Sequence, residues 1–369
     1  MTDNPIIIDS EDSRLMRKAL SLARRTWPSP NPRVGAIIVK DGVIVGRGRH
    51  LHYGGAHAEV YALQKAGQKA YSATVYVTLE PCSHHGRTGP CAEALIEAGV
   101  SRVVAGCIDP NPNVAGQGVA MLRAAGIDVV TGVEEERARR LIAGHARFMT
   151  VGLPYVVWKY AMSLDGKVAT SSGESRWVTG EQSRREVHRM RCNADAVVIG
   201  IGTALTDDPE LTVRGVVDNH QPKRVVFDSN GRLPLQSRLL NSPGGAVIVV
   251  VSSNCPQANQ RRLQDAGASV VSAGESRVDV RQALQMLANH FDIREILLES
   301  GPELAASMVG AGLVQEAVCF IAGKLIGGRE APGPLGGGGL DTLADASLVE
   351  ISRVRRFGDD VALYGKLSR

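Results

Sequence analysis

Aromatic residues are scarce in this chain of 369 residues, at 4% of the total. Proteins that bind single-stranded nucleic acids usually combine a basic groove with aromatic side chains on which bases stack. The formal net charge is only +4, from 42 basic and 38 acidic residues, and the arginines occur as scattered pairs such as Arg24-Arg25 and Arg261-Arg262. This composition disfavours a nucleic-acid partner, whereas a phosphorylated small molecule would need only a few local arginines.

The chain also has no uninterrupted apolar run near the roughly 18 residues that a membrane-spanning helix needs. Its first residues, Met-Thr-Asp-Asn-Pro, have neither the basic nor the apolar region of a secretory signal. Six cysteines in a long chain without a secretion signal are not expected to form a disulfide framework. We therefore expect a cytoplasmic protein without a membrane partner, in which Cys107, Cys192, Cys255 and Cys319 are small buried apolar residues.

The first half predicts a hairpin followed by alternating helices and strands. Apolar spacing indicates a helix over 10–25, and Asp41-Gly42 joins two apolar segments in the manner of a two-residue turn. Further helices are expected at 57–66, 91–98 and 119–125, and strands at 74–79, 102–108 and 127–130. This order predicts a three-layer α/β/α sandwich.

A segment at 145–154 interrupts the alternation and is interpreted as the linker between two domains, 1–147 and 153–369. After it, strands are expected at 155–161, 196–199, 224–227, 246–251, 269–271, 295–298 and 317–321, with helices at 181–191, 256–266, 280–289 and 303–309. Two strand-like segments close the chain, and the glycine-rich segment 333–339 must be a loop. No G-x-G-x-x-G follows a strand, so the usual dinucleotide fingerprint is absent.

Three residues of the first half have the types and surroundings of zinc ligands. His57 opens an expected helix, Cys82 follows a strand and Cys91 opens the next helix, where the helix dipole favours a thiolate. Catalytic zinc sites use three protein ligands and leave the fourth position to a water, whose pKa the metal lowers. Glu59 lies two residues beyond His57, so it would not share that ligand's helix face and could instead reach the water as a proton shuttle.

Two other interpretations of this cluster stay open at this point. A structural zinc site would need a fourth protein ligand, which His84 or His85 could supply. The cysteines could also be core residues beside an unrelated histidine. Neither alternative gives Glu59 a role, so we favour a catalytic site.

The pattern His57-Ala58-Glu59 with Pro81-Cys82 and Pro90-Cys91 resembles the zinc nucleobase deaminases, in which a non-ligand Glu is the acid/base. The eight residues between the two cysteines depart from the short spacing of that superfamily. Together with Asn31-Pro32-Arg33-Val34-Gly35 and the segments 78–91 and 106–112, this longer loop resembles the bifunctional deaminase/reductase family of riboflavin biosynthesis. The resemblance implies a cytidine-deaminase-like first domain, in which Asn31 holds the pyrimidine and Asp109–Asn111 line the pocket; read alone, these are turn residues.

The second half resembles the reductase domain of the same family in several segments, including 159–167, 175–177, 200–203, 206–214 and 299–302. The resemblance implies a dihydrofolate-reductase-like α/β fold that binds NADPH, which would account for the missing fingerprint. It implies a cofactor site made by Ala161, Trp177, Thr203, Asp207, Gly301, Pro302, Glu303, Leu304, Ala305, Ala306 and Ser307. It implies substrate contacts from Ser175, Arg191, Leu211, Arg214 and Glu299, the two arginines being suited to a phosphate.

These inferences lead to one functional hypothesis. The first domain would use zinc to deaminate 2,5-diamino-6-ribosylamino-4(3H)-pyrimidinone 5′-phosphate. The second would reduce the ribose of the product to ribityl with NADPH, with Lys159 and Glu299 as candidate polar groups at the reacting carbon. We expect a homo-oligomer; the competing hypotheses are a deaminase acting on nucleic-acid bases and a non-enzymatic metal-binding module.

Overall fold

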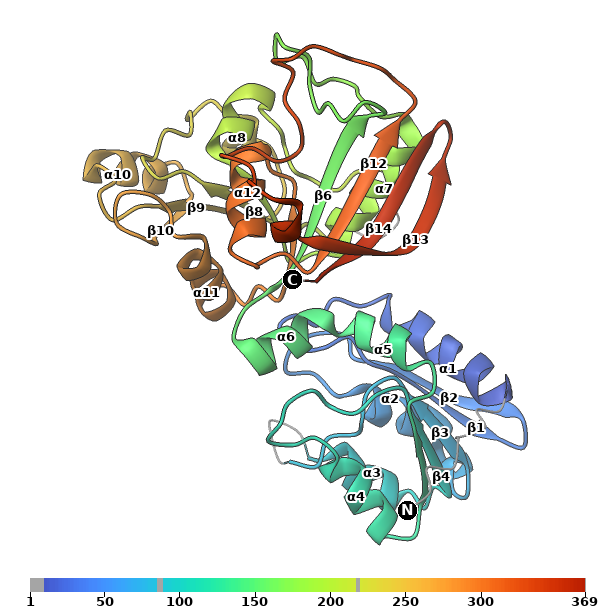
Figure 1. Cartoon of the computed structure of the whole chain (residues 1–369). Coiled ribbons are helices and arrows are strands. Elements are labelled where there is room, and N and C mark those ends of the chain that lie inside the picture. The colour runs from blue at the N-terminus through green and yellow to red at the C-terminus, as the bar shows by residue number, and fades with distance from the viewer. Residues whose placement is uncertain (1–9, 85–88, 217–219, 369) are drawn as a thin grey trace. The chain divides into compact units, whose positions relative to one another are not determined.

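The computed structural model describes residues 10–84, 89–216 and 220–368, and the chain divides into two compact units, Met1–Gly152 and Leu153–Arg369. Each unit has a sheet of its own (Figure 1). The segment expected to be the linker, 145–154, lies largely in helix α6 (Ala143–Val151). Only Gly144 of this helix is buried, so its sequence lacks the apolar periodicity that would have predicted a helix. Among the described residues, no helix could span a membrane.

The first unit contains a five-stranded sheet with the order β2-β1-β3-β4-β5. The strands are β1 (Gly35–Lys40), β2 (Val43–Arg49), β3 (Thr74–Val77), β4 (Arg102–Ala105) and β5 (Asp128–Thr131). Strand β1 runs antiparallel to β2 and β3, and β3, β4 and β5 are parallel. Asp41 and Gly42 both have positive φ, at 49° and 73°, which the two-residue hairpin turn requires. The predicted hairpin is therefore confirmed.

Helices cover both faces of this sheet. Helix α1 (Ser10–Ala23) packs on β1 and β3 and contacts α5 (Glu135–Leu141). Helix α2 (Ala58–Ala66) packs on β1 and β2 and contacts α3 (Cys91–Glu97). Helix α3 in turn contacts α4 (Gln117–Ala124). A short 3₁₀ turn, η1 (Gly67–Ala70), follows α2. The three-layer α/β/α prediction is confirmed. Helix α5 was not predicted, because Ala138 is its one buried residue.

The second unit contains a nine-stranded sheet with the order β10-β9-β8-β7-β11-β6-β12-β14-β13. These strands are β6 (Tyr155–Ser163), β7 (Ala196–Gly200), β8 (Lys223–Phe227), β9 (Val247–Val251), β10 (Ser269–Ser272), β11 (Glu295–Leu298), β12 (Glu316–Ala322), β13 (Leu348–Phe357) and β14 (Asp360–Ser368). Neighbours from β10 to β12 pair in parallel, and β14 pairs antiparallel with both β12 and β13.

The central strands of this sheet are buried on both faces. Val197 and Ile199 of β7 lie in one apolar core, and Val198 between them lies in the opposite core. Since adjacent residues of a strand point to opposite faces, a sheet covered on both sides needs a continuous apolar strand, as β7 is. This explains why such segments were recognisable in the sequence.

The second unit has six helices in its described residues: α7 (Glu181–Cys192), α8 (Ile201–Asp207), α9 (Arg238–Asn241), α10 (Gln257–Asp265), α11 (Val280–His290) and α12 (Pro302–Gly310), with a 3₁₀ turn η2 (Leu343–Asp345). Leu284 of α11 and Met308 of α12 belong to one core, and Leu239 of α9 and Leu263 of α10 to the other. The short helices α8 and α9 were not predicted. This arrangement is the predicted α/β class, and its parallel strands bring their carboxyl ends to one edge of the sheet.

Candidate functional site

The three predicted metal ligands meet in the first unit. His57 is the N-cap of α2, Cys82 follows β3 by a short segment, and Cys91 is the first residue of α3. His57 Nδ1 lies 3.2 Å from Cys91 Sγ and 3.5 Å from Cys82 Sγ, and the three ligand atoms all lie within 4.8 Å of one another. A tetrahedral zinc ion bound by nitrogen and sulfur separates such ligands by about 3.6 Å. The donor types and their spacing therefore fit zinc.

Close helix–strand packing sets where His57 lies. A Cβ on Gly48 would be 1.9 Å from the carbonyl oxygen of Ala58, and one on Gly46 would be 2.3 Å from that of Ala62. Both glycines are in β2, and both alanines are in α2. Because neither glycine has a side chain, α2 can lie directly on the strand, which brings its N-terminus to the cysteines.

A buried carboxylate orders the chain around Cys82. Glu80 accepts hydrogen bonds from the backbone N–H groups of Asp109, Gly116 and Val119 at 3.0, 2.9 and 3.0 Å. In the same region, a Cβ on Gly118 would be 1.9 Å from the carbonyl oxygen of Pro81. The segment 109–119 is thus fastened beside the metal ligands. Sequence reasoning did not single out Glu80.

Glu59 lies within the protein beside these ligands, with 3% of its surface exposed. Its Oε2 is buried and has no hydrogen-bond partner among the described residues. Burial raises the pKa of this carboxyl to about 7. A buried carboxylate oxygen without a partner is costly unless a ligand or water meets it, as a proton shuttle at a metal-bound water would require.

The two cysteines are joined by hydrogen bonds. A hydrogen bond from the Cys91 thiol, with His57 adding to it, lowers the pKa of Cys82 to about 4, and the same bond raises the pKa of Cys91. The sequence predicted that the helix dipole would favour a thiolate at Cys91. The Cys91 N–H at this helix start also donates to Cys82 Sγ at 3.3 Å.

The two possible fourth ligands do not join the cluster in the described chain. His84 is exposed and is not one of the grouped ligands, and His85 lies outside the described residues. Asn31, predicted to hold the pyrimidine, has Nδ2 3.0 Å from Nε2 of His50. His50 Nδ1 lies 2.9 Å from the carbonyl oxygen of Ala56, and its ring contacts the ring of His57 edge to face at 5.3 Å. His50 thus links Asn31 to the metal site, and no sequence pattern indicated it.

A cleft of about 1060 Å³ lies in the second unit. Every predicted substrate residue lines it, namely Ser175, Arg191, Leu211, Arg214 and Glu299. So do the predicted cofactor residues Ala161, Trp177, Thr203, Asp207, Gly301, Pro302, Glu303, Leu304 and Ser307. Ala305 and Ala306 are not in its wall, and Ala305 is fully buried in the core. Their position on α12, which turns every 3.6 residues, separates them from the cleft-facing residues of the same segment.

Three charged side chains form the centre of this cleft. Arg191 donates from Nε and Nη2 to the two carboxylate oxygens of Glu299 at 2.6 and 3.0 Å, and Lys159 Nζ lies 3.7 Å from Oε2. Burial alone raises the pKa of Glu299, but the charges of Arg191 and Lys159 outweigh it and lower the pKa to about 2. Burial also lowers the pKa of Lys159, which the charge of Glu299 partly opposes. The centre therefore holds an ionised carboxylate against a buried amine.

The N-terminus of α12 lies at the same cleft. Gly301 is its N-cap and donates its N–H to Thr203 Oγ1 at 2.9 Å, which joins α12 to α8. The glycine-rich segment 333–339 packs here: a Cβ on Gly336 would be 2.3 Å from Glu303 Oε1 and 3.2 Å from Pro302 Cβ. The later N–H groups of this helix start could hold a phosphate.

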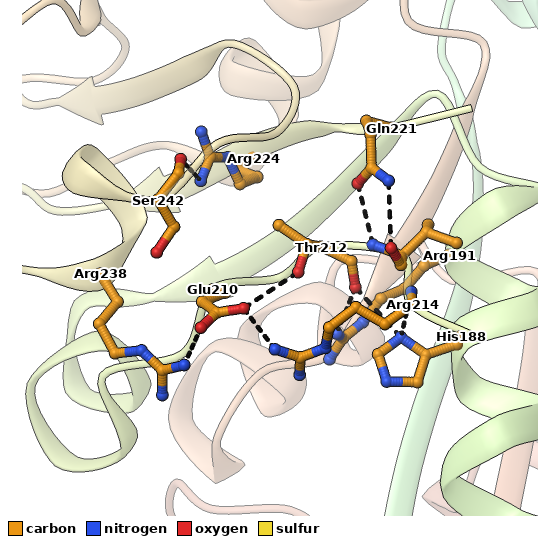
Figure 2. Close-up of polar contacts among 10 residues, drawn as sticks. His188, Arg191, Glu210, Thr212, Arg214, Gln221, Arg224, Arg238 and Ser242 are labelled. Carbon is orange, nitrogen blue, oxygen red and sulfur yellow. Dashed lines mark hydrogen bonds and ion pairs between the residues drawn. The ribbon is translucent and has the colours of Figure 1, made fainter. Parts of the chain in front are cut away.

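A second set of charges lies at another part of the cleft wall. Figure 2 shows Arg214 and Arg238 both directed at the carboxylate of Glu210, with which each forms an ion pair. Both arginines are about half exposed, at 57% and 48% of their side chains. Sequence reasoning selected Arg214 and missed Arg238. It also missed Ser229 and Arg277, which line the cleft from loops after β8 and β10.

Comparisons with known proteins give the same division of the chain. Residues 154–363 match the RibD C-terminal domain, and residues 9–107 match the cytidine and deoxycytidylate deaminase zinc-binding region. The chain is 40% identical over 358 residues to the riboflavin biosynthesis protein RibD of Aquifex aeolicus (strain VF5), covering 96% of this chain and 98% of that protein. It is 41% identical to the RibD protein of Escherichia coli (strain K12), covering 96% and 99%.

Solved structures agree along almost the whole chain. Acinetobacter baumannii RibD, form 1, superposes with a TM-score of 0.87 at 38% identity, covering 97% of this chain and 99% of that one. A Thermotoga maritima protein has a TM-score of 0.84 at 33% identity, with the same coverage. That protein is described as a diaminohydroxyphosphoribosylaminopyrimidine deaminase/5-amino-6-(5-phosphoribosylamino)uracil reductase.

Proposed function

Because the chain belongs to the RibD family of riboflavin-biosynthesis proteins, and is an enzyme with a deaminase and a reductase domain, we propose that it performs two successive steps on one phosphorylated pyrimidine. The first removes the 2-amino group of 2,5-diamino-6-ribosylamino-4(3H)-pyrimidinone 5′-phosphate by hydrolysis. The second reduces the ribose of the product to ribityl. The name of the Thermotoga maritima relative describes the same pair of activities.

The observation that carries the first step is the partnerless Oε2 of buried Glu59 beside a three-ligand site. His57, Cys82 and Cys91 would hold Zn²⁺, which lowers the pKa of a bound water and so makes it a nucleophile at neutral pH. Glu59 would accept the proton of that water and deliver it to the departing ammonia. The ring carbon gains oxygen and loses nitrogen, so the step consumes one water and releases one ammonia.

Asn31 would orient the pyrimidine for this attack. His50 Nδ1 lies beside a carbonyl oxygen, which can only accept, so this nitrogen carries the ring proton and Nε2 accepts from Asn31 Nδ2. The Asn31 amide is held with its NH₂ toward His50. Its carbonyl oxygen would then accept a hydrogen bond from an N–H of the substrate.

We propose that the cleft of the second unit binds NADPH and the deaminated intermediate. Its volume exceeds the upper range of single-ligand pockets, about 1,000 Å³, which suits two ligands together. NADPH would supply a hydride to C1′ of the ribose in its open, imine form. Glu299 is ionised and cannot give a proton, so Lys159, whose Nζ lies 3.7 Å from Glu299 Oε2, is the proposed donor of a proton to the imine nitrogen.

Arg214 would contact the phosphate of this substrate. Arg191 lines the same cleft, but its Nε and Nη2 donate to Glu299 and its Nη1 donates to the carbonyl oxygen of Thr212. Its proposed role is therefore to hold Glu299 toward the substrate, while the half-exposed Arg214 exchanges its partner Glu210 for the phosphate. Ser175 and Leu211 complete the substrate side, and Asp207 and Trp177 the cofactor side.

The direct test follows both products in one reaction. Purified enzyme with the diamino substrate and NADPH should release ammonia, and NADPH consumption should follow with a lag that shortens as enzyme is added. Ammonia release without any NADPH oxidation would contradict the second step, and NADPH oxidation without ammonia would contradict the order.

Glu59→Gln should retain zinc by metal analysis and lose ammonia release by at least 100-fold, since general acid–base catalysis contributes about 10²–10⁴-fold. Glu97→Gln, an exposed glutamate on α3, is the matched control and should behave as wild type. Substantial deamination by the Glu59 variant would remove this residue from the proton transfer.

Chelation separates the two sites. Removal of metal should stop ammonia release, while NADPH oxidation with the deaminated intermediate continues unchanged. Loss of both activities would contradict independent sites.

Arg214→Ala should raise the KM of the pyrimidine by about tenfold or more and leave that of NADPH within twofold, since a charge-assisted hydrogen bond is worth about 1.5–3 kcal/mol. Arg185→Ala, an exposed arginine on α7, is the charge-matched control. A larger effect on NADPH would move Arg214 to the cofactor site.

We also propose that the protein is a cytoplasmic homo-oligomer with no membrane or nucleic-acid partner. All six cysteines are free, and two of them are zinc-ligand candidates that need a reducing compartment. Strand β13 at the sheet edge exposes Leu348, Val349, Ile351 and Val354, which a second copy could cover. Ile351→Lys should reduce the mass measured by light scattering, and an unchanged mass would exclude β13 from the interface.

A further inference from the structure

The segment 211–214 forms part of the reductase cleft without belonging to a helix or a strand. Leu211 and Arg214 line the cleft wall, whereas Thr212 and Val213 between them are each only 7% exposed. Leu211 has a positive φ of 55°, which is uncommon for a residue with a Cβ. Because the segment pairs with no strand among the described residues, its buried N–H and C=O groups need other partners.

Gln221 bonds to both backbone groups of Val213. Its Oε1 accepts from the Val213 N–H at 2.9 Å, and its Nε2 donates to the Val213 carbonyl oxygen at 3.1 Å (Figure 2). The side-chain amide thereby replaces the backbone of a neighbouring antiparallel strand, which would exchange the same two hydrogen bonds. Gln221 lies two residues before β8 and is not part of the cleft wall. It is therefore not placed to contact a ligand of the cleft.

Two side chains of α7 bond to the remaining atoms of the same two peptide groups. Arg191 Nη1 donates to the carbonyl oxygen of Thr212 at 3.1 Å. The N–H of Arg214 donates to His188 Nδ1 at 3.3 Å. The peptide groups 212–213 and 213–214 are thus each bonded at the oxygen and at the N–H. Since a peptide group is planar, bonds at both atoms fix its orientation.

The orientation of the peptide group 213–214 determines where the Arg214 side chain leaves the backbone. Arg214 is 57% exposed, and its guanidinium pairs with Glu210 at the cleft wall. A long, exposed side chain loses rotamer freedom when it binds a ligand. A backbone that is already fixed leaves less to be ordered on binding, which strengthens the contact.

We propose that Gln221 is a positioning residue of the reductase, which holds the backbone of Val213 and so keeps Arg214 in place for the substrate phosphate. The inference rests on the proposed function, which assigns that phosphate to Arg214. Gln221 touches neither ligand and acts through Arg214. Its loss therefore weakens the binding of the phosphorylated pyrimidine and leaves the cofactor unaffected.

The test compares Gln221→Met with the wild type in the reduction of the deaminated intermediate by NADPH. Methionine keeps the length of the side chain and loses both hydrogen bonds. The KM of the intermediate should rise by about 3- to 10-fold, the effect of about one hydrogen bond, with kcat and the KM of NADPH unchanged within about twofold. Hydrogen exchange of the Val213 and Arg214 amides should become at least about tenfold faster.

A double-mutant cycle with Arg214→Ala shows whether Gln221 acts through Arg214. Adding Gln221→Met to Arg214→Ala should change the KM of the intermediate by less than about 1.5-fold. The same factor in both backgrounds would overturn the proposal, because Gln221 would then act on the cleft by another route. An unchanged KM in the single variant, or an equal rise in the KM of NADPH, would overturn it as well.

Gln315→Met controls for the general loss of a buried hydrogen bond. The Gln315 side-chain oxygen accepts from the N–H of Val156 at 2.9 Å, at the start of β6 and outside the cleft wall. This variant should lower the free energy of unfolding in urea and leave both KM values within about twofold. An equal rise in the pyrimidine KM would show that lost stability alone produces the effect. Gln221→Ala, which adds no volume, is measured in the same way if Gln221→Met does not fold.

A failure of the proposed function is seen in a different variant. If Arg214→Ala alone left the KM of the intermediate unchanged, Arg214 would not hold the phosphate, and the proposed function would be wrong on this point whatever Gln221 does. If Arg214→Ala raised the KM and Gln221→Met did not, only the role of Gln221 would be overturned.

Discussion

Replacing Glu299 by Gln tests the charged centre of the reductase cleft. The carboxylate is 8% exposed and accepts two hydrogen bonds from Arg191, with Lys159 at 3.7 Å. These two charges lower its pKa from an ordinary 4.5 to about 2. A difference of about 2.5 units at about 1.36 kcal/mol each corresponds to about 3 kcal/mol in favour of the folded, ionised state. Glutamine keeps the shape of the side chain and loses this contribution.

The sign of the pH dependence follows from the direction of the shift. A carboxylate with a lowered folded-state pKa contributes its full stability above the ordinary value of 4.5, and that contribution is lost as the pH falls toward 2. The wild type should therefore exceed Glu299→Gln by about 3 kcal/mol at pH 7 and by only about 1.5 kcal/mol at pH 3. For a unit of this size, the pH 7 difference corresponds to a Tm about 6–12 °C lower.

Urea unfolding and scanning calorimetry of the full chain at pH 7, 4 and 3 measure this difference in the transition of the second unit. Glu181→Gln is the matched control, since Glu181 pairs with Arg185 on the surface at 77% exposure and should change stability by less than about 0.5 kcal/mol. A loss below about 1 kcal/mol for Glu299→Gln at pH 7, or a loss that does not shrink on acidification, would refute the reasoning.

Three further predictions concern the first unit. Gly48→Ala places a Cβ 1.9 Å from a backbone oxygen of α2, so zinc affinity measured against a competing chelator should fall about 10- to 100-fold. Gly35→Ala is the control, because its Cβ would lie 2.2 Å from a backbone oxygen of α1. It should lower stability and leave zinc affinity nearly unchanged. Asp12→Asn loses a two-point ion pair with Arg102 at 3.0 and 2.8 Å, and should cost about 2 kcal/mol in urea unfolding at pH 7. Because the pKa of Asp12 is lowered by its hydrogen bonds against the opposing effect of burial, that cost should shrink below pH 4, and a constant cost would disprove the pairing. Glu80→Ala should speed hydrogen exchange of the amides of Asp109, Gly116 and Val119 at least tenfold, and unchanged exchange would show that other contacts hold this segment.

Local patterns carry their information over a few residues, and features of that kind could be predicted. The hairpin at Asp41-Gly42 follows from two positive-φ positions in succession. The β7 segment is recognisable because both faces are buried and its apolar run is continuous. The three candidate ligands, which the structure brings together, could be selected because zinc restricts its ligands to a few residue types and because helix starts at His57 and Cys91 are visible in the chain.

Weakly patterned helices were missed for the corresponding reason. Helices α5 and α6 each bury a single residue, Ala138 and Gly144, so their sequences show no apolar stripe. Helix α6 was mistaken for the linker on that ground. The apolar pattern of a sequence reflects which residues are buried, so a helix that buries few residues shows no clear pattern.

By itself, then, the sequence determined which side chain types are available and where, and from them it predicted two thiols and an imidazole for a metal and Glu59 for the proton. Only the tertiary structure decided which groups neutralise or orient one another. Arg191 meets Glu299 from 108 positions away, and Asn31 meets His50 across 19. The tertiary structure also decided that the N–H of Cys91, at the start of α3, donates a hydrogen bond to Sγ of Cys82. Such pairings depend on how strands and helices pack, which no local spacing encodes, and they orient Glu299, Asn31 and Cys82.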